Sequence, residues 1–99
     1  MTTSILETSD QVIAKLSGEL DTAAAPLAEQ SLQPLADKGK DIVIDCSELE
    51  YISSSGLRIF LSILKQAQPF GKQVVLKNVN DVIRDVLEIS GFISLFVIE

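Results

Sequence analysis

The stretch Tyr51-Ile52-Ser53-Ser54-Ser55-Gly56-Leu57-Arg58 joins an expected strand to an expected helix, and it decides the fold of this chain. Upstream, Asp41–Asp45 is an apolar run bracketed by acids, which is typical of a buried strand. Downstream, apolar residues recur at helical spacing from Leu57 to Leu64. The serines therefore lie at a strand-to-helix corner. Side chains are exposed there, and the free N–H groups of the first helical turn can meet an anion.

The rest of the chain alternates between strand and helix patterns. From the N-terminus we expect strands at 4–8 and 11–16, a helix at 24–37 capped by Asp21 or Thr22, a strand at 41–45, a helix from the serine corner to about 68, a strand at 73–77, a helix capped by Asn78 or Asn80 and ended by Gly91, and a strand at 95–98. Pro34 predicts a kink or an early end in the first helix. This order predicts an α/β fold with one mixed sheet of four to five strands and helices packed mainly on one side.

Composition limits the class of protein. The chain has 99 residues, 46% of them hydrophobic, so we expect one domain spanning residues 1–99. Its net charge of −6 argues against binding a nucleic-acid backbone. No apolar stretch approaches about 18 residues and no basic leader precedes one, so we expect a cytoplasmic protein without direct membrane insertion. With one cysteine, Cys46, and no histidine, we expect no internal disulfide, metal or cofactor.

The serine corner has three chemical interpretations: a helix cap, a nucleophile or a phosphorylation target. A serine hydrolase needs a base, but the chain has no histidine, no GxSxG elbow and no SxxK at this corner. A nucleotide-binding P-loop needs GxxxxGK[ST], which is absent. Asp41 and Asp45 flank a strand but lack the acidic pair of a magnesium-binding receiver domain. We therefore expect a binding protein and not an enzyme, with at least one serine capping the helix. Capping and a tight corner do not explain why three hydroxyls share one exposed loop.

Four blocks of sequence resemble the anti-sigma factor antagonists of the STAS domain family. The blocks are Gly18-Glu19-Leu20-Asp21, Ile42–Ser47 with Leu49, Tyr51–Leu57, and Ile89-Ser90-Gly91-Phe92. The resemblance implies a single STAS domain that binds an anti-sigma factor, itself a serine kinase, and so releases a sigma factor for transcription. It implies that the kinase phosphorylates the serine two positions before the glycine, here Ser54, and that a serine phosphatase reverses this.

The same resemblance implies a set of site residues. We expect partner contacts at Asp21, Thr22, Ser53, Ser55, Gly56 and Arg58, all near the serine corner. The chain differs from the family in two places. Ser53 stands where many members carry aspartate, and the usual helix after the last strand is expected to be absent because the sequence ends at Glu99. The alternative is a STAS binding subunit of a transporter or signalling assembly that is never phosphorylated.

Overall fold

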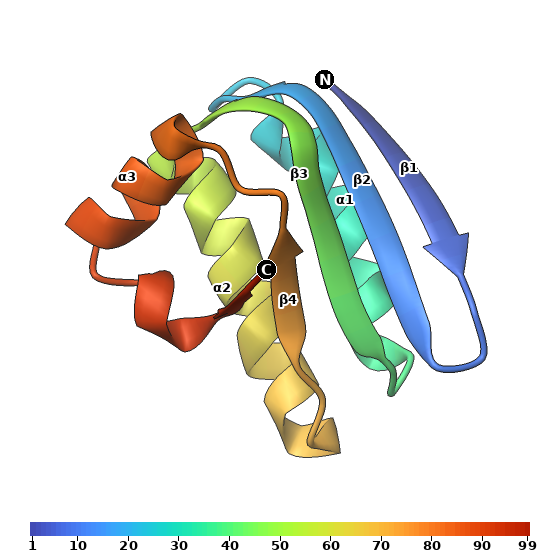
Figure 1. Ribbon diagram of the computed structural model, residues 1–99. Helices are drawn as coiled ribbons and strands as arrows, with labels where there is room; N and C mark the ends of the chain where they lie inside the picture. The colour runs from blue at the N-terminus through green and yellow to red at the C-terminus, as the bar shows by residue number, and fades with distance from the viewer.

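Five strands form one mixed sheet in the computed structural model, which describes residues 1–99 (Figure 1). The strands are β1 (Thr2–Glu7), β2 (Gln11–Leu20), β3 (Asp41–Ile52), β4 (Val74–Lys77) and β5 (Val97–Ile98), and they lie in that order across the sheet. The helices are α1 (Ala25–Leu32), α2 (Ser54–Ala67) and α3 (Asp81–Ile89). Only β1 and β2 are antiparallel, whereas every other neighbouring pair is parallel. The predicted fold class and order of elements are confirmed.

The strand before the serine corner is longer than its sequence predicts. β3 continues past Asp45 to Ile52, because its second half still pairs with β2 until Ile52 lies opposite Leu20. Leu49 and Ile52 are buried within this second half, where Ser47, Glu48 and Glu50 hide the strand pattern in the sequence. The strand therefore delivers the chain directly to Ser53, without an intervening loop.

The first helix is shorter than predicted. It ends at Leu32 and continues as a 3₁₀ segment, Gln33–Asp37, because Pro34 cannot donate the backbone hydrogen bond that an α-helix requires. Its N-cap is Ala24, not Asp21 or Thr22, and no side chain caps it. At the other end of the chain, the expected strand at 95–98 is reduced to β5 by a 3₁₀ turn at Ile93–Leu95.

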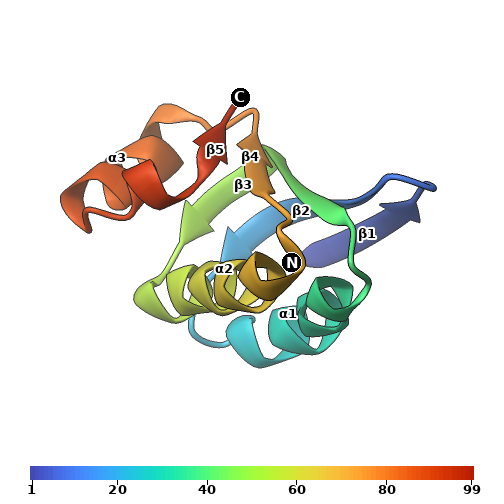
Figure 2. The same cartoon turned by 90° about the horizontal axis from the view of Figure 1, so that it is seen from below.

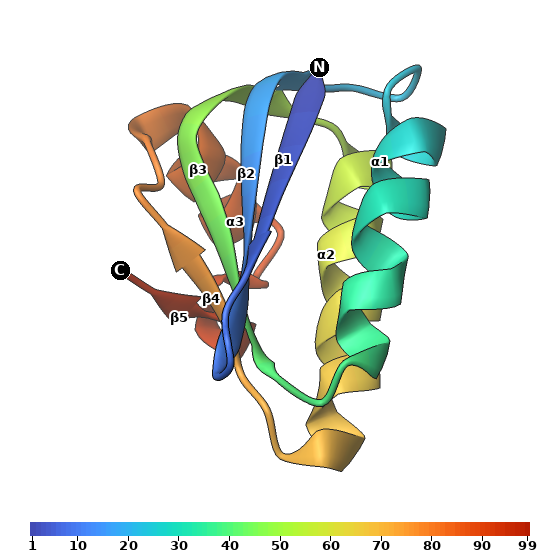
Figure 3. The ribbon, with the colours of Figure 1, turned by 90° about the vertical axis from the view of Figure 1, so that its right-hand side faces the viewer.

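Helices α1 and α2 lie side by side against one face of the sheet (Figures 2 and 3). Buried residues alternate along the strands toward this layer, as with Ile42, Ile44 and Cys46 in β3. The aromatic rings of Phe60 in α2 and Phe96 pack edge to face, with their centroids 6.4 Å apart. α3 lies toward the β4–β5 edge of the sheet (Figure 2), and its buried residues are Ile83 and Leu87.

No helix covers the opposite face of β1–β4 (Figures 1 and 3). One apolar residue from each strand forms a row across it, in the order Leu6, Ile13, Val43, Val75 and Val97. Beside this row, burial would raise the pKa of Asp45, but hydrogen bonds from Asn78 and the Ser47 N–H outweigh it and lower that pKa.

The lone cysteine belongs to the core. Cys46 is fully buried, and burial raises the pKa of its thiol to about 12, so it stays protonated at neutral pH. No helix of the structure is both long enough and apolar enough to span a bilayer.

Candidate functional site

The candidate site lies at the end of the sheet where β2 and β3 finish and all three helices begin (Figure 1). The chain is held there by the backbone N–H of Ser53, which donates to the carbonyl oxygen of Leu20 at 2.8 Å. A second link comes from Asn80, which precedes α3. Its amide nitrogen donates to the Leu49 carbonyl at 2.8 Å, and its side-chain oxygen accepts from the Ile83 N–H at 2.9 Å. The sequence indicates Asn80 as a helix cap, which the structure confirms, but carries no signal for its bond to β3.

The three serines of the corner have three different environments. Ser53 is the N-cap of α2, with only 7% of its surface exposed, and its hydroxyl oxygen accepts from the Gly56 N–H at 3.1 Å. Ser54 is the first residue of the helix and is exposed, whereas Ser55 is half-buried. Neither Ser54 nor Ser55 takes part in the cap, and Ser54 is the more exposed of the two.

The capping role of Ser53 explains why serine stands at this position. The N-cap needs a short side chain with an oxygen acceptor, and serine and aspartate serve about equally well. Serine here, in place of the aspartate that the family resemblance leads us to expect, therefore preserves the helix start.

Removing the cap gives a direct test of this role. We expect Ser53→Ala to lower the free energy of unfolding by about 1 kcal/mol, because the Gly56 N–H loses its buried acceptor. Ser53→Asp keeps an acceptor, so its free energy of unfolding should lie within about 0.5 kcal/mol of that of the natural chain. Urea denaturation of the three proteins measures both values, and equal stability of Ser53→Ala and the natural chain would contradict the role.

Gly56 is buried, and α2 lies close against the sheet at this residue. A Cβ atom at this position would lie 2.6 Å from Cγ of Leu20 and 3.0 Å from Cγ1 of Ile52. Both neighbours are core residues, 0% and 2% exposed. Gly56 and Ser53 are among the residues predicted to contact a partner, but the structure buries both, so they position the corner beneath that surface.

The exposed predicted residues gather around a shallow hollow between α1 and α2. Its volume is about 410 Å³, and it is lined by Thr22, Ala25, Pro26, Glu29, Ser55, Arg58 and Ile59. Thr22 and Arg58 are exposed, and Arg58 lies one turn along α2 from Ser54. The structure therefore brings together three of the predicted residues, Thr22, Ser55 and Arg58, beside Ser54. Glu29, which the sequence analysis does not single out, joins them from α1.

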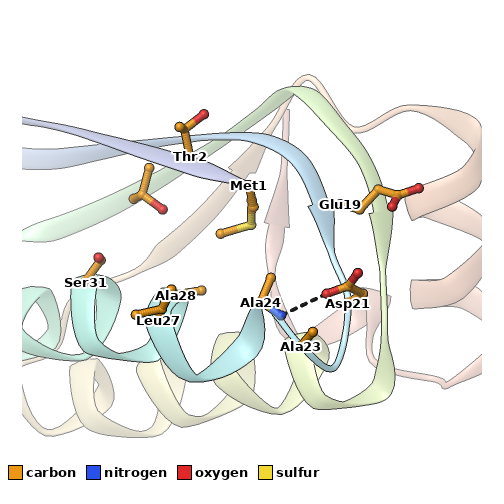
Figure 4. Close-up of a pocket in the computed structure, with 10 residues that line it drawn as sticks. Met1, Thr2, Glu19, Asp21, Ala23, Ala24, Leu27, Ala28 and Ser31 are labelled. Carbon is orange, nitrogen blue, oxygen red and sulfur yellow. Dashed lines mark hydrogen bonds between the residues drawn. The ribbon is translucent and has the colours of Figure 1, made fainter.

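Asp21 closes the loop that leads into α1. Its Oδ1 accepts from the Ala24 N–H at 2.8 Å, as the dashed line in Figure 4 shows. The residue is half-buried and precedes Thr22, but its side chain lines a different hollow, between β1 and α1, and not the one beside Ser55. The site has no deep cavity, and no three side chains of His, Cys, Asp or Glu lie close enough to hold a metal ion. An exposed hydroxyl on a shallow surface suits contact with another protein.

Comparison with known proteins agrees with this arrangement. A family model for the STAS domain matches residues 3–99. The chain belongs to the STAS domain family. The sequence resemblance to that family is confirmed.

The relatives of this STAS domain are named for one activity. It is 41% identical over 86 residues to BtrV of Bordetella bronchiseptica, a candidate anti-sigma factor antagonist, and the match covers 86% of this chain and 74% of BtrV. It is 33% identical to the anti-sigma-B factor antagonist of Staphylococcus aureus strain NCTC 8325, with 78% of this chain and 72% of that one covered. The domain therefore falls among the anti-sigma factor antagonists by sequence.

Solved structures show the same fold. The unphosphorylated form of the anti-sigma factor antagonist SpoIIAA superposes with a TM-score of 0.83 at 21% identity, covering 99% of this STAS domain and 88% of SpoIIAA. SpoIIAA of Bacillus in its phosphorylated form superposes with a TM-score of 0.76 at 21% identity, covering 99% and 91% of the two chains.

Proposed function

We propose that this STAS domain binds an anti-sigma factor that is also a serine kinase, and that phosphorylation of Ser54 ends the binding. The observation that carries the proposal is the exposure of Ser54 at the first position of α2, beside a Ser53 hydroxyl committed to the cap. The proposed contact surface consists of Ser54 with Asp21, Thr22, Ser55 and Arg58. The two relatives described above carry the name of anti-sigma factor antagonist.

The proposed modification is a phosphoryl transfer from ATP. The Ser54 hydroxyl oxygen attacks the γ-phosphorus, its proton passes to a base of the kinase, and ADP leaves. The domain itself needs only to present the oxygen, and the exposed start of α2 does so. Ser53 is a poor acceptor because its oxygen is buried and already accepts the Gly56 N–H.

A phosphate at Ser54 changes the surface much more than the fold. It adds about −1.5 to −2 charges at pH 7, next to the positive end of the α2 dipole and its free N–H groups. The domain tolerates this charge, but a partner packed against a neutral hydroxyl would have to desolvate it. One covalent group can therefore separate the two proteins without unfolding either.

Mapping the phosphate tests the proposal. The domain is incubated with ATP and the serine kinase that co-purifies with it, and the product is digested for mass spectrometry. We expect one phosphate, on Ser54, and none in Ser54→Ala. Phosphate outside residues 53–55 would contradict the proposed site. Stable capture of a transporter or signalling assembly, without phosphorylation, would favour a STAS binding subunit instead.

Asp21 provides an independent test of the contact surface. We expect Asp21→Ala to weaken binding of the anti-sigma factor by about tenfold, equivalent to about 1.4 kcal/mol, measured by calorimetry. Because alanine also removes the acceptor for the Ala24 N–H, Asp21→Asn is the matched control, since it keeps an acceptor and loses the charge. A similar loss with asparagine places the carboxylate in the interface. If Asp21→Asn bound the anti-sigma factor as tightly as the natural chain does, the role of Asp21 would be to hold the loop and not to contact the partner.

A further inference from the structure

Arg58 is a cation without an ion-pair partner in this structure. Its side chain is exposed, and the ion pairs of the domain are formed by Lys15, Lys38 and Lys40 instead. Arg58 is the only cation that lines the hollow between α1 and α2. It is also the only charged residue of α2 before Lys65. The first turns of α2 therefore carry one unpaired positive charge.

The helix directs this charge toward Ser54. Ser54 and Arg58 are four residues apart in an unbroken α-helix, so they are neighbours on one face, with their Cβ atoms about 5–6 Å apart. Side chains of a helix lean toward its N-terminus, so Arg58 covers the turn that begins at Ser54. The lining of the hollow agrees with this, because it places Arg58 beside Ser55 and Thr22, near the start of α2.

The acids of the neighbouring elements leave Arg58 free. Glu29 of α1 lines the same hollow, but no ion pair joins it to Arg58. Asp21 lines the hollow on the other side of α1, and Glu48 of β3 is held by Lys15 at 2.8 Å. Glu50 is exposed in β3 and is likewise unpaired. A new anion beside Arg58 would therefore not have to displace a bound carboxylate.

A phosphate on Ser54 is the anion that suits this arrangement. It carries about −1.5 to −2 charges at pH 7 and three strong acceptor oxygens. The planar guanidinium of arginine can donate two parallel hydrogen bonds to such a group. An acid four residues before a base is also the more favourable order for an ion pair along a helix. Phosphorylation would thus create a strong acceptor within reach of the unpaired cation.

We propose that Arg58 binds the phosphate of phosphorylated Ser54 within the same domain. Because it requires phosphate on Ser54, this role of Arg58 rests on the proposed function. Phosphorylation then acts twice on the contact surface. It adds a charge at Ser54, and it engages the cation that the unmodified surface presents to the anti-sigma factor. The backbone of α2 need not move, since the helix already holds the two side chains on one face.

The pKa of the phosphate tests this contact directly. Phosphoserine is incorporated at position 54 during translation, so that no kinase is needed, and the isolated domain is titrated by phosphorus NMR. A neighbouring cation favours the dianion and lowers its pKa. We expect the titration midpoint to lie about 0.5 pH unit lower in the natural chain than in Arg58→Gln, as for an exposed ion pair.

Two further variants separate a local contact from a general effect of charge. Lys65→Gln removes the other cation of α2, about 16 Å from Ser54 along the helix, and should leave the midpoint unchanged. Arg58→Lys keeps the charge without the planar fork, and should restore at least half of the shift. Glu29 is present in every variant, so its repulsion of the phosphate is the same throughout.

The Nε–H resonance of Arg58 provides a second readout. We expect it to move when Ser54 carries phosphate, relative to the unmodified domain, and we expect unchanged amide dispersion to show that every variant is folded. Equal midpoints for the natural chain and Arg58→Gln would overturn the proposal. So would an equal shift in Lys65→Gln, no recovery in Arg58→Lys, or an Nε–H resonance that ignores the phosphate.

These measurements are independent of the test of the proposed function. If Arg58 proves not to bind the phosphate, Ser54 can still be the residue that the kinase modifies, and the added charge alone would separate the two proteins. If phosphate mapping instead excludes Ser54 as the acceptor, the incorporated phosphoserine still shows whether Arg58 binds it. The two failures therefore give different results.

Discussion

Replacing Ser54 by aspartate is expected to weaken binding of the anti-sigma factor at least about a hundredfold while leaving the domain folded. The substitution adds a negative charge at the first residue of α2, where the helix dipole favours it. At the interface the same charge is buried without a partner, which costs about 3 kcal/mol or more and corresponds to about a hundredfold in affinity. Calorimetry measures the binding, and circular dichroism with urea denaturation checks the fold.

Ser9→Asp is the matched control for this experiment. It makes the same change on an exposed serine in the β1–β2 turn, at the opposite end of the sheet. We expect its affinity to equal that of the natural chain, and Ser54→Ala to retain binding as well. If Ser9→Asp also lost binding, the effect would come from the net charge and not from the position of Ser54. If Ser54→Asp bound as tightly as the natural chain, Ser54 would not lie in the interface.

Gly56→Ala is expected to lower the free energy of unfolding by about 2 kcal/mol. A single added methyl group would lie 2.6 Å from Cγ and 2.9 Å from Cδ2 of Leu20, which is fully buried. Overpacking of this kind costs about 1–3 kcal/mol, and this cost exceeds the gain of about 1 kcal/mol from replacing glycine by alanine within a helix. The midpoint of urea denaturation measures the difference.

An exposed position on the same helix provides the comparison. Gln66→Ala should change the free energy of unfolding by less than about 0.5 kcal/mol, because the side chain lies in solvent. If Gly56→Ala were as stable as the natural chain, α2 would be able to move away from Leu20. The requirement for glycine at this corner would then lie elsewhere.

The sequence predicts the order of elements well because its periodicities are strong where the core is built. It predicts β3 poorly beyond Asp45, because pairing with β2 across two register shifts, and not a run of apolar residues, carries the strand to Ile52. It also predicts Asp21 or Thr22 as the cap of the first helix, whereas the Asp21 carboxylate closes the turn before α1. In both cases, contacts between distant segments decide the local structure.

The serine corner shows the same limit for the site. Three identical side chains follow one another, so composition cannot distinguish them, and the family resemblance supplies the prediction of Ser54. Only the phase of α2 shows that Ser53 is turned inward to the Gly56 N–H while Ser54 is exposed. The buried role of Gly56 is similarly invisible until Leu20 is found against it.

The contact of Gly56 with Leu20 and Ile52 has a consequence for how quickly the proposed switch can respond. Because α2 lies directly against the sheet at Gly56, we expect the start of the helix to keep its position when a phosphate is added. The two states of the domain would then share one backbone and differ only in the chemistry of an exposed oxygen. No refolding or domain movement would delay the response. Its speed would be set by the kinase that adds the phosphate and the phosphatase that removes it.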